Sequence, residues 1–275
     1  MTTEYKFKSW AGVDARALQG QDQSRIAIPI HLSPPQPPTH LKSHPPTQIV
    51  VNIQYCADSR SKSGFAKYWR GPYRSAIQIP EALDPAVAVP MLCGGVTVFS
   101  PLERVRAGTK AETVDAIGIG GLGHFAILFA RALGTEVTAI SSHYIASVDD
   151  VSESDKGHER PLDLIFCTLN PSELVVTNYF PLLRSNDTLV LVGIIPTPLQ
   201  VPLIPLFTGQ IALAGSVAGS PDDIRKMLDF AADKKIKAWI NKRDMNDINR
   251  ALPAFRSEGS RYRYVLVNKE QRGQL

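Results

Sequence analysis

Short runs of Val, Ile and Leu alternate with amphipathic stretches along most of the chain after residue 84. Five runs are apolar on both faces, which is typical of parallel strands covered by helices: 113–119, 136–141, 162–168, 188–194 and 210–217. Residues 122–133 carry apolar side chains every three or four positions and stop at Gly134, so they predict a helix. A second helix is predicted over 173–184. This alternation predicts a doubly wound α/β domain.

The pattern continues differently toward the C-terminus. Ser220 precedes Pro221 and two aspartates, a sequence that predicts the start of a helix ending near Lys234. Residues 245–259 are helical in pattern but contain Pro253, which a helix interior tolerates poorly. Residues 261–267 alternate polar and apolar side chains and predict a half-exposed strand.

The first 84 residues lack this periodicity. Residues 33–47 hold six prolines among polar residues, which predicts an extended connector or a disordered loop. Three histidines near it, His31, His40 and His44, are the residue type of a metal site, but no carboxylate or thiol lies at ligand spacing. We therefore interpret them as solvated loop residues.

Composition and charge exclude several classes of protein. The 275 residues are 44% hydrophobic and 20% charged, with 30 basic and 26 acidic side chains in no basic stripe, so nucleic acid is not an expected partner. The start is polar, without a secretory signal, and no uninterrupted apolar run reaches membrane-spanning length. Cys56, Cys93 and Cys167 are too far apart in sequence for a disulfide framework. We expect a cytoplasmic protein that binds neither nucleic acid nor membrane.

Candidate chemistry begins with the glycines between the 113–119 strand and the 122–133 helix. They follow the pattern Gly118-x-Gly120-Gly121-x-Gly123. Such a turn lets the backbone approach a pyrophosphate, whose charge meets free N–H groups at the helix N-terminus. Because a strand precedes and a helix follows, a dinucleotide site is favoured over a purely structural turn.

The end of the following strand bears on which dinucleotide binds. A carboxylate that grips the adenosine ribose of NAD is expected about 20 residues on, yet no Asp or Glu occurs between Glu136 and Asp149. The hydroxyls of Ser141 and Ser142 could instead donate hydrogen bonds to a 2′-phosphate, which favours NADP(H). The alternative is that two polar residues simply end a strand.

One residue of the first strand departs from the apolar pattern. Asp115 lies mid-strand, where a buried carboxylate is costly unless it is paired or protonated. Strand interiors lie far from the reactive end of a cofactor, so we interpret Asp115 as a sign of relaxed packing.

Several motifs together resemble one enzyme family. GIGGLGH (118–124), PMLCGGVTVFSPL (90–102), GSVAGSPDDIRKML (215–228) and RYRYVLVN (261–268) occur in the order found in zinc-dependent medium-chain alcohol dehydrogenases. The branch they resemble is the cinnamyl-alcohol-dehydrogenase-like one, in its fungal and yeast form. The resemblance implies a Rossmann NADP-binding domain at 85–218 and a GroES-like catalytic domain built from both chain ends, 1–84 and 219–275.

The resemblance also implies site residues. Cys93 matches a zinc ligand of the family and Thr97 the threonine packed against the nicotinamide, so both are catalytic candidates. The implied cofactor-binding residues are Gly118, Gly120, Gly121, Leu122, Gly123, Ser141, Ser142, Thr168, Gly193 and Ser216. His124 belongs to the same turn, where it either packs the helix start or contacts phosphate. A homodimer is possible, since the family often dimerises through a sheet edge.

The departures from the family concern the metal. Its first two zinc ligands and its four-cysteine structural zinc lobe have no counterpart, and the proline-rich segment stands where most of the GroES-like barrel belongs. The family's helix after Ser142 is also missing, and 143–150 resembles its third strand. One thiolate does not form a catalytic zinc site, so Cys93 is either a remaining ligand or a small buried side chain.

These observations leave the chemistry open in stated ways. If reduction occurs without zinc, Tyr68, Tyr73 or Arg74 are possible proton donors, or else they are core aromatics and a solvated arginine. The favoured function is an NADP(H)-dependent alcohol dehydrogenase or aldehyde reductase acting on a small alcohol or aldehyde. The alternatives are a nucleotide-binding pseudoenzyme and a non-functional remnant that lacks the zinc site.

Overall fold

The computed structural model describes residues 77–140, 162–169, 176–193, 198–251 and 262–267, together with the backbone of 26–27. The chain divides into two compact units. One comprises Met1–Cys93 and Gly219–Leu275, and the other comprises Gly94–Ala218. The roles assigned from sequence to 1–84, 85–218 and 219–275 stay predictions.

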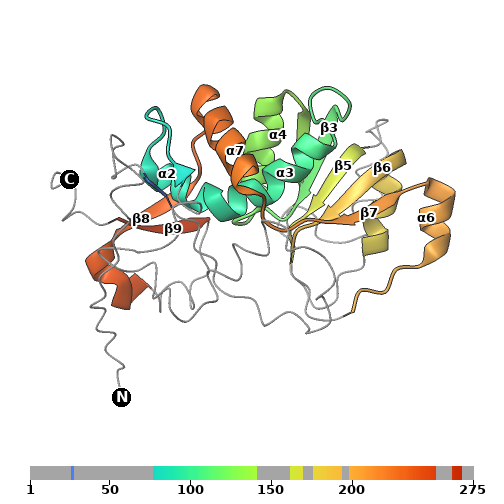
Figure 1. Cartoon of the computed structure of the whole chain (residues 1–275). Helices are drawn as coiled ribbons and strands as arrows, with labels where there is room; N and C mark the ends of the chain where they lie inside the picture. Colours follow the sequence, from blue (N-terminus) through green and yellow to red (C-terminus); the bar gives the residue numbers. More distant parts are fainter. Residues whose placement is uncertain are drawn as a thin grey trace, which may run out of the picture. The chain divides into compact units, whose positions relative to one another are not determined.

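The unit Gly94–Ala218 is built on a five-stranded sheet in which all described strands run parallel (Figure 1). In space the order is β4-β3-β5-β6-β7, with β3 next to both β4 and β5. The strands are β3 (Thr113–Ile117), β4 (Glu136–Ile140), β5 (Leu162–Cys167), β6 (Leu183–Leu191) and β7 (Ala212–Gly215). Each of the five apolar runs predicted as parallel strands overlaps one of these, and the strand predicted at 261–267 is β9 (Arg263–Val267) of the other unit.

Helices cover both faces of this sheet. On one face α4 (Gly123–Leu133) packs against β3 and β4, and its Phe129 meets Phe99 of α3 (Val96–Arg104) with ring centroids 5.3 Å apart. On the other face a buried cluster joins β3, β5 and β6 to the 3-10 helix η5 (Val176–Leu182). The predicted doubly wound α/β fold is confirmed.

Two predictions about the crossover segments are wrong in detail. Of the helix predicted over 173–184, the described part is the short 3-10 helix η5, and β6 already begins at Leu183, five residues before the predicted strand. Pro181 lies inside η5 and has no N–H to donate, which explains why a regular helix does not extend through it. No sequence pattern indicated α6 (Leu203–Gly209), which has no buried residue.

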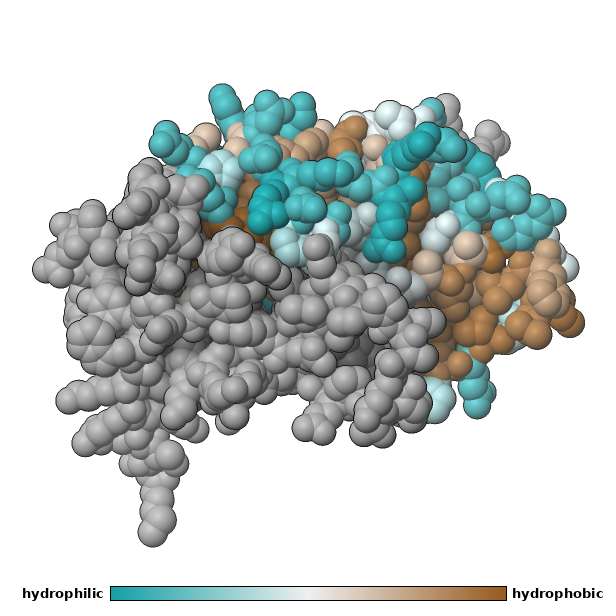
Figure 2. Space-filling model, in the orientation of Figure 1, coloured by the Kyte–Doolittle hydropathy of each residue, from teal (hydrophilic) through white to brown (hydrophobic). Residues whose placement is uncertain are grey.

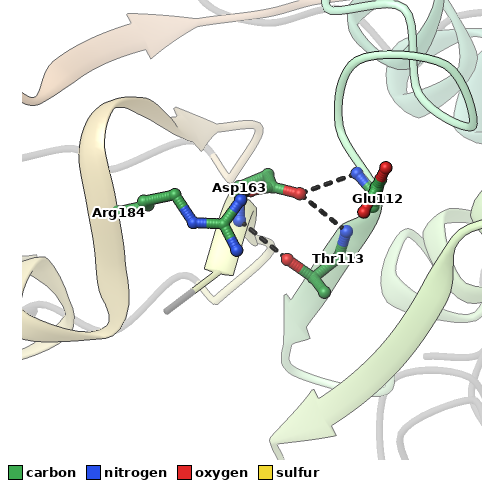
Figure 3. A network of polar contacts seen from close by, with 4 residues as sticks. All are labelled: Glu112, Thr113, Asp163 and Arg184. Carbon is green, nitrogen blue, oxygen red and sulfur yellow. Dashed lines mark hydrogen bonds and ion pairs between the residues drawn. The ribbon is translucent and has the colours of Figure 1, made fainter. Parts of the chain in front are cut away.

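At the amino end of the sheet, the carboxylate of Asp163 fastens β5 to β3 (Figure 3). It accepts hydrogen bonds from the backbone N–H groups of Glu112 (2.7 Å) and Thr113 (2.9 Å) and forms an ion pair with Arg184. In return the hydroxyl of Thr113 accepts the backbone N–H of Asp163 at 3.0 Å. This network completes the pairing where the strand ladder has not yet begun.

The other unit combines residues from both ends of the chain. The two-residue strands β1 (Ile26–Ala27) and β2 (Ile77–Gln78) pair antiparallel, and β8 (Ile240–Asp244) pairs parallel with β9 (Arg263–Val267). The predicted helix after Ser220 is α7 (Pro221–Asp233), and its capping box is formed by Ser220 and Asp223. Strand β8 was not predicted, because Asn, Lys, Arg and Asp occupy most of it.

One long helical stretch bears on the expectation that no apolar run reaches membrane-spanning length. Residues 85–104, made of α2 (Pro85–Pro90), the π-helical turn η3 (Met91–Gly95) and α3, are long and apolar enough for a membrane span by length and composition. The sequence pattern alone did not reveal this stretch. Its most apolar window is 72% buried within the protein, as in the core helix of a globular domain.

Several sequence predictions lie outside the described residues. These are the proline-rich 33–47 segment and its histidines, the candidate donors Tyr68, Tyr73 and Arg74, the cofactor candidates Ser141 and Ser142, the strand at 143–150, and Pro253. Of the predicted helix over 245–259, the described part begins with the 3-10 turn η6 (Met245–Asp247).

Candidate nucleotide site

The glycine turn between β3 and α4 has a conformation that depends on missing side chains. Gly118 has a φ of +91°, a region that residues with a Cβ rarely adopt. A Cβ on Gly123 would lie 1.8 Å from the carbonyl oxygen of Gly118, so the start of α4 crosses the end of β3 at a distance that only glycine allows. The two glycines therefore set the path of the turn.

A threonine from the neighbouring strand holds this turn in place. Thr168 follows β5 directly, and its hydroxyl lies 2.9 Å from the carbonyl oxygens of both Ile117 and Gly118. Its backbone N–H also donates to Ile117 at 3.0 Å. The structure thus brings the predicted site residues Thr168, Gly118 and Gly123 together. The hydrogen bonds of Thr168 are made to the backbone of the turn.

The outer side of the turn is open. Gly120 is exposed, and a Cβ placed on it would meet no atom within 4 Å. The backbone N–H groups of Leu122 and Gly123 have no hydrogen-bond acceptor among the described residues. They stand at the N-terminus of α4, where the helix dipole is positive. This arrangement can receive an anionic group against bare backbone, and a cradle of this kind fits a pyrophosphate.

His124, for which two roles remained open, is completely buried. Its Nδ1 lies 3.1 Å from the carbonyl oxygen of Gly120, and its ring packs against that of Phe125 at a tilt of 37° with centroids 4.0 Å apart. Since a carbonyl only accepts, Nδ1 donates to the turn. His124 therefore supports the turn from inside the protein, in agreement with the packing alternative.

The residues predicted at the reactive end are divided between the two units. Cys93 belongs to the unit of the chain ends and is half-buried, whereas Thr97, Gly193 and Ser216 belong to the sheet unit. Within the sheet unit the Thr97 carbonyl accepts a hydrogen bond from the Ser216 hydroxyl at 3.4 Å. The Ser216 hydroxyl in turn accepts one from Arg104 at 3.1 Å, a contact that spans 112 positions and has no signal in the sequence.

The part of the chain that the structure describes contains no set of ligands for a catalytic metal. No group of three or more His, Cys, Asp or Glu side chains there could hold a metal ion. Burial lowers the pKa of Arg263, and the Cys93 thiol nearby acts in the opposite direction. The described surroundings of Cys93 therefore include a cation. A zinc site, which needs about three protein ligands, does not fit these residues.

A buried acid lies within the sheet below the turn. Asp115 is inaccessible to solvent, and no described side chain donates a hydrogen bond to its carboxyl oxygens. Burial raises its pKa to about 7, against a smaller lowering contribution from a hydrogen bond with the backbone of Ala116. Burial likewise raises the pKa of Tyr179, and negative charge on Cys167 and Asp115 raises it further. Because Asp115 is completely buried, we expect its ionisation to affect the stability of the sheet, and its interpretation as a sign of relaxed packing stays a prediction.

Comparison with known proteins identifies relatives over most of the chain. No family model matches it. A probable cinnamyl alcohol dehydrogenase of Pinus taeda is 32% identical over 221 residues, or 75% of this chain and 61% of the relative. The aldehyde reductase AdhA of Synechocystis is 36% identical over 220 residues, again 75% of this chain and 65% of the relative. The chain thus spans less than two thirds of the length of these two relatives.

Solved structures agree with the sequence matches. The cinnamyl alcohol dehydrogenase SbCAD4 of Sorghum bicolor superposes with a TM-score of 0.62 at 31% identity, covering 70% of this chain and 58% of that one. CAD from Helicobacter pylori, solved with NADP(H), gives a TM-score of 0.58 at 27% identity over the same shares.

This chain spans a larger share of one further relative. A probable mannitol dehydrogenase of Stylosanthes humilis is 30% identical over 241 residues, which is 82% of this chain and 67% of the relative. Together with the parallel sheet and the glycine turn, these matches show that the chain belongs to the medium-chain alcohol dehydrogenase family, in the group that contains the cinnamyl alcohol dehydrogenases.

Proposed function

We propose that this chain is an NADP(H)-dependent alcohol dehydrogenase or aldehyde reductase that acts on a small alcohol or aldehyde. The observation that carries the proposal is the cradle formed by exposed Gly120 and the acceptor-free N–H groups of Leu122 and Gly123 among the described residues. Relatives named cinnamyl alcohol dehydrogenase and aldehyde reductase support the substrate class. A bound NADPH would supply hydride to the carbonyl carbon of an aldehyde, whose oxygen takes up a proton to give the alcohol.

We base the preference for NADP(H) over NAD(H) on charge. No Asp or Glu occurs between Glu136 at the start of β4 and Asp149, so no carboxylate repels a 2′-phosphate there. The Helicobacter pylori CAD binds NADP(H). We therefore expect the purified chain to bind NADPH at least tenfold more tightly than NADH, a difference of about 1.4 kcal/mol in binding free energy.

A fluorescence titration with each nucleotide tests the cradle, with Gly120→Asp as the informative variant. The new carboxylate would project into open space, so the fold should be unaffected while the like charge repels the pyrophosphate. Glu136→Gln, which alters an exposed charge at the far end of β4, is the matched control. Equal NADPH affinity in the wild type and Gly120→Asp would refute nucleotide binding at this turn.

We further propose that the chain works without catalytic zinc and belongs to the fungal and yeast type of its branch, with internal parts of the catalytic domain missing. Cys93 is the only family zinc ligand matched in the sequence, and the described residues offer no cluster of three ligands. NADPH oxidation with aromatic and aliphatic aldehydes should then be insensitive to chelators. One equivalent of zinc in the purified protein, with activity lost on chelation, would contradict this.

The same lack of ligands favours one alternative, a pseudoenzyme that binds NADPH without turnover. Without zinc, another group must stabilise the negative charge that develops on the carbonyl oxygen, a contribution worth several kcal/mol. Nucleotide binding with no oxidation of NADPH by any aldehyde of the panel would favour this alternative over the reductase.

For the partner, we propose a homodimer formed at the β7 edge of the sheet. No described strand pairs with the outer side of β7, and α6 beside it exposes Leu203, Ile204 and Phe207 at 59%, 73% and 71%. Figure 2 shows hydrophobic surface at the right of the molecule, where Figure 1 places α6. A contiguous apolar patch of this kind marks an interaction surface. Sedimentation should give a dimer, and Phe207→Glu should give a monomer.

A further inference from the structure

The guanidinium of Arg104, at the C-terminal end of α3, is held by oxygen atoms that carry no formal charge. Its Nε donates to the carbonyl oxygen of Ser100 at 3.4 Å, and its Nη2 donates to the hydroxyl of Ser216 at 3.1 Å. It forms no ion pair with a carboxylate of the described residues. Two neutral contacts, one within α3 and one to the residue after β7, therefore orient this exposed side chain.

Ser216 connects Arg104 to the turn that follows β7. Its hydroxyl accepts a hydrogen bond from Arg104 and donates one to the Thr97 carbonyl oxygen at 3.4 Å. The hydroxyl thus acts as acceptor and donor at the same time. Its backbone N–H donates to Leu191 of β6 at 3.0 Å. Two residues later the Ala218 N–H donates to the hydroxyl of Thr97 at 3.1 Å. The turn is thus bound to α3 at both of its ends.

The conformation of this turn needs such support. Ala218 has a φ of +52°, in the left-handed region that a residue with a Cβ enters only at a steric cost. It is also buried, so water does not replace a lost contact to its N–H. The turn keeps this backbone path because the surrounding hydrogen bonds determine it.

The turn lies on the half of the sheet opposite the adenosine side. The strands β4 and β7 are the two outer strands of the sheet. Because all five strands run parallel, their carboxyl ends lie along the same side of the sheet. Ser216, which follows β7, is therefore on that side but at the opposite end from β4. In doubly wound dinucleotide folds the two halves each bind one mononucleotide. If the β4 half receives the adenosine, the turn after β7 belongs to the nicotinamide half.

We propose that Arg104 is a positioning residue for the nicotinamide half of the site, acting through Ser216 to fix the Ser216–Ala218 turn against Thr97. This inference rests on the proposed NADP(H) function. Among the described residues no hydrogen bond joins Arg104 to the glycine turn that would hold the pyrophosphate, so its loss should disturb the placement of the ring more than the affinity for the nucleotide.

The test compares Arg104→Met with Arg104→Lys and with Arg131→Met, a control at the exposed end of α4. In the protein without nucleotide, amide hydrogen exchange at Ala218 should be at least tenfold faster in Arg104→Met and unchanged in the control. Arg104→Lys, which keeps a donor, should restore part of the protection. Ser216→Ala breaks the same bridge from its other end and should reproduce the effect if Arg104→Met folds poorly.

With NADPH and an accepted aldehyde, Arg104→Met should lower kcat about tenfold while the Kd of NADPH changes less than about twofold, since small misplacement of reacting atoms slows the chemical step. Unchanged exchange at Ala218 in both Arg104→Met and Ser216→Ala would overturn the inference. So would a kcat equal to that of the control. If the wild type binds no NADPH, the proposed function is wrong. The positioning role of Arg104 is then wrong as well, even if amide exchange at Ala218 is faster in Arg104→Met as expected.

Discussion

Replacing Asp115 with Asn should remove a large pH-dependent contribution to the stability of the parallel sheet. The wild-type carboxyl is fully buried in β3, next to Thr138 of β4 and Ile165 of β5 in the strand register, and no described side chain donates a hydrogen bond to it. Its ionised form is therefore poorly solvated in the folded state, whereas in the unfolded chain water solvates it freely.

The size of the effect follows from the two pKa values of Asp115. Burial raises the pKa from 3.8 in the unfolded chain to about 7 in the folded protein. The folded state binds this proton more tightly than the unfolded chain does. The contribution of protonated Asp115 to the free energy of unfolding is therefore fully present below pH 4 and is lost as pH rises to about 7. Each pKa unit corresponds to about 1.4 kcal/mol, so the loss amounts to about 4 kcal/mol, a large part of the stability of an ordinary domain.

Two measurements test this reasoning. Chemical denaturation followed by circular dichroism at pH 4, 5, 6, 7 and 8 gives the free energy of unfolding, and hydrogen exchange of the 113–117 peptide reports on β3 itself. Trp10, Trp69 and Trp239 all belong to the other unit, so tryptophan fluorescence is not a suitable probe of this sheet. Glu136→Gln, an exposed acid of β4, is the control.

The outcome that refutes the reasoning is specific. If the unfolding free energies of wild type and Asp115→Asn run parallel from pH 4 to pH 8, burial does not raise the pKa of Asp115 in the folded protein. A carbon-13 titration of the Asp115 carboxyl with a midpoint near 4 would lead to the same conclusion. In the expected case, the difference between the two proteins changes by about 4 kcal/mol across this range in favour of Asp115→Asn at high pH.

Other substitutions probe the remaining contacts. Asp163→Ala should destabilise the sheet unit by about 3 kcal/mol, measured by denaturation, because two strand N–H groups and Arg184 lose their acceptor; Arg184→Met should cost less, since that side chain is 48% exposed. Gly123→Ala should abolish NADPH binding and lower the melting temperature, and unchanged melting would contradict the close crossing at Gly118. Ser220→Ala should cost about 1 kcal/mol through loss of the α7 cap, seen as faster exchange in its first turn.

Local features were predictable because neighbouring residues determine them. The apolar runs located all five described strands of the sheet, and Gly134, with a φ of +95°, ends α4 as expected of a glycine at a helix C-terminus. The glycine spacing predicted the turn after β3, since its conformation depends on the absence of side chains at fixed positions. The helix predicted over 173–184 failed because periodicity does not register the missing N–H of Pro181.

The sequence by itself determined the alternation of strands and helices, the glycine turn and the α7 cap, all set by contacts within a few residues. Only the tertiary structure decided that β8 pairs with β9, that Asp163 fastens β5 to β3, and that Arg104 reaches Ser216. These contacts join residues up to 112 positions apart. Their geometry arises when packing brings separate elements together, so no local pattern of side chains encodes them.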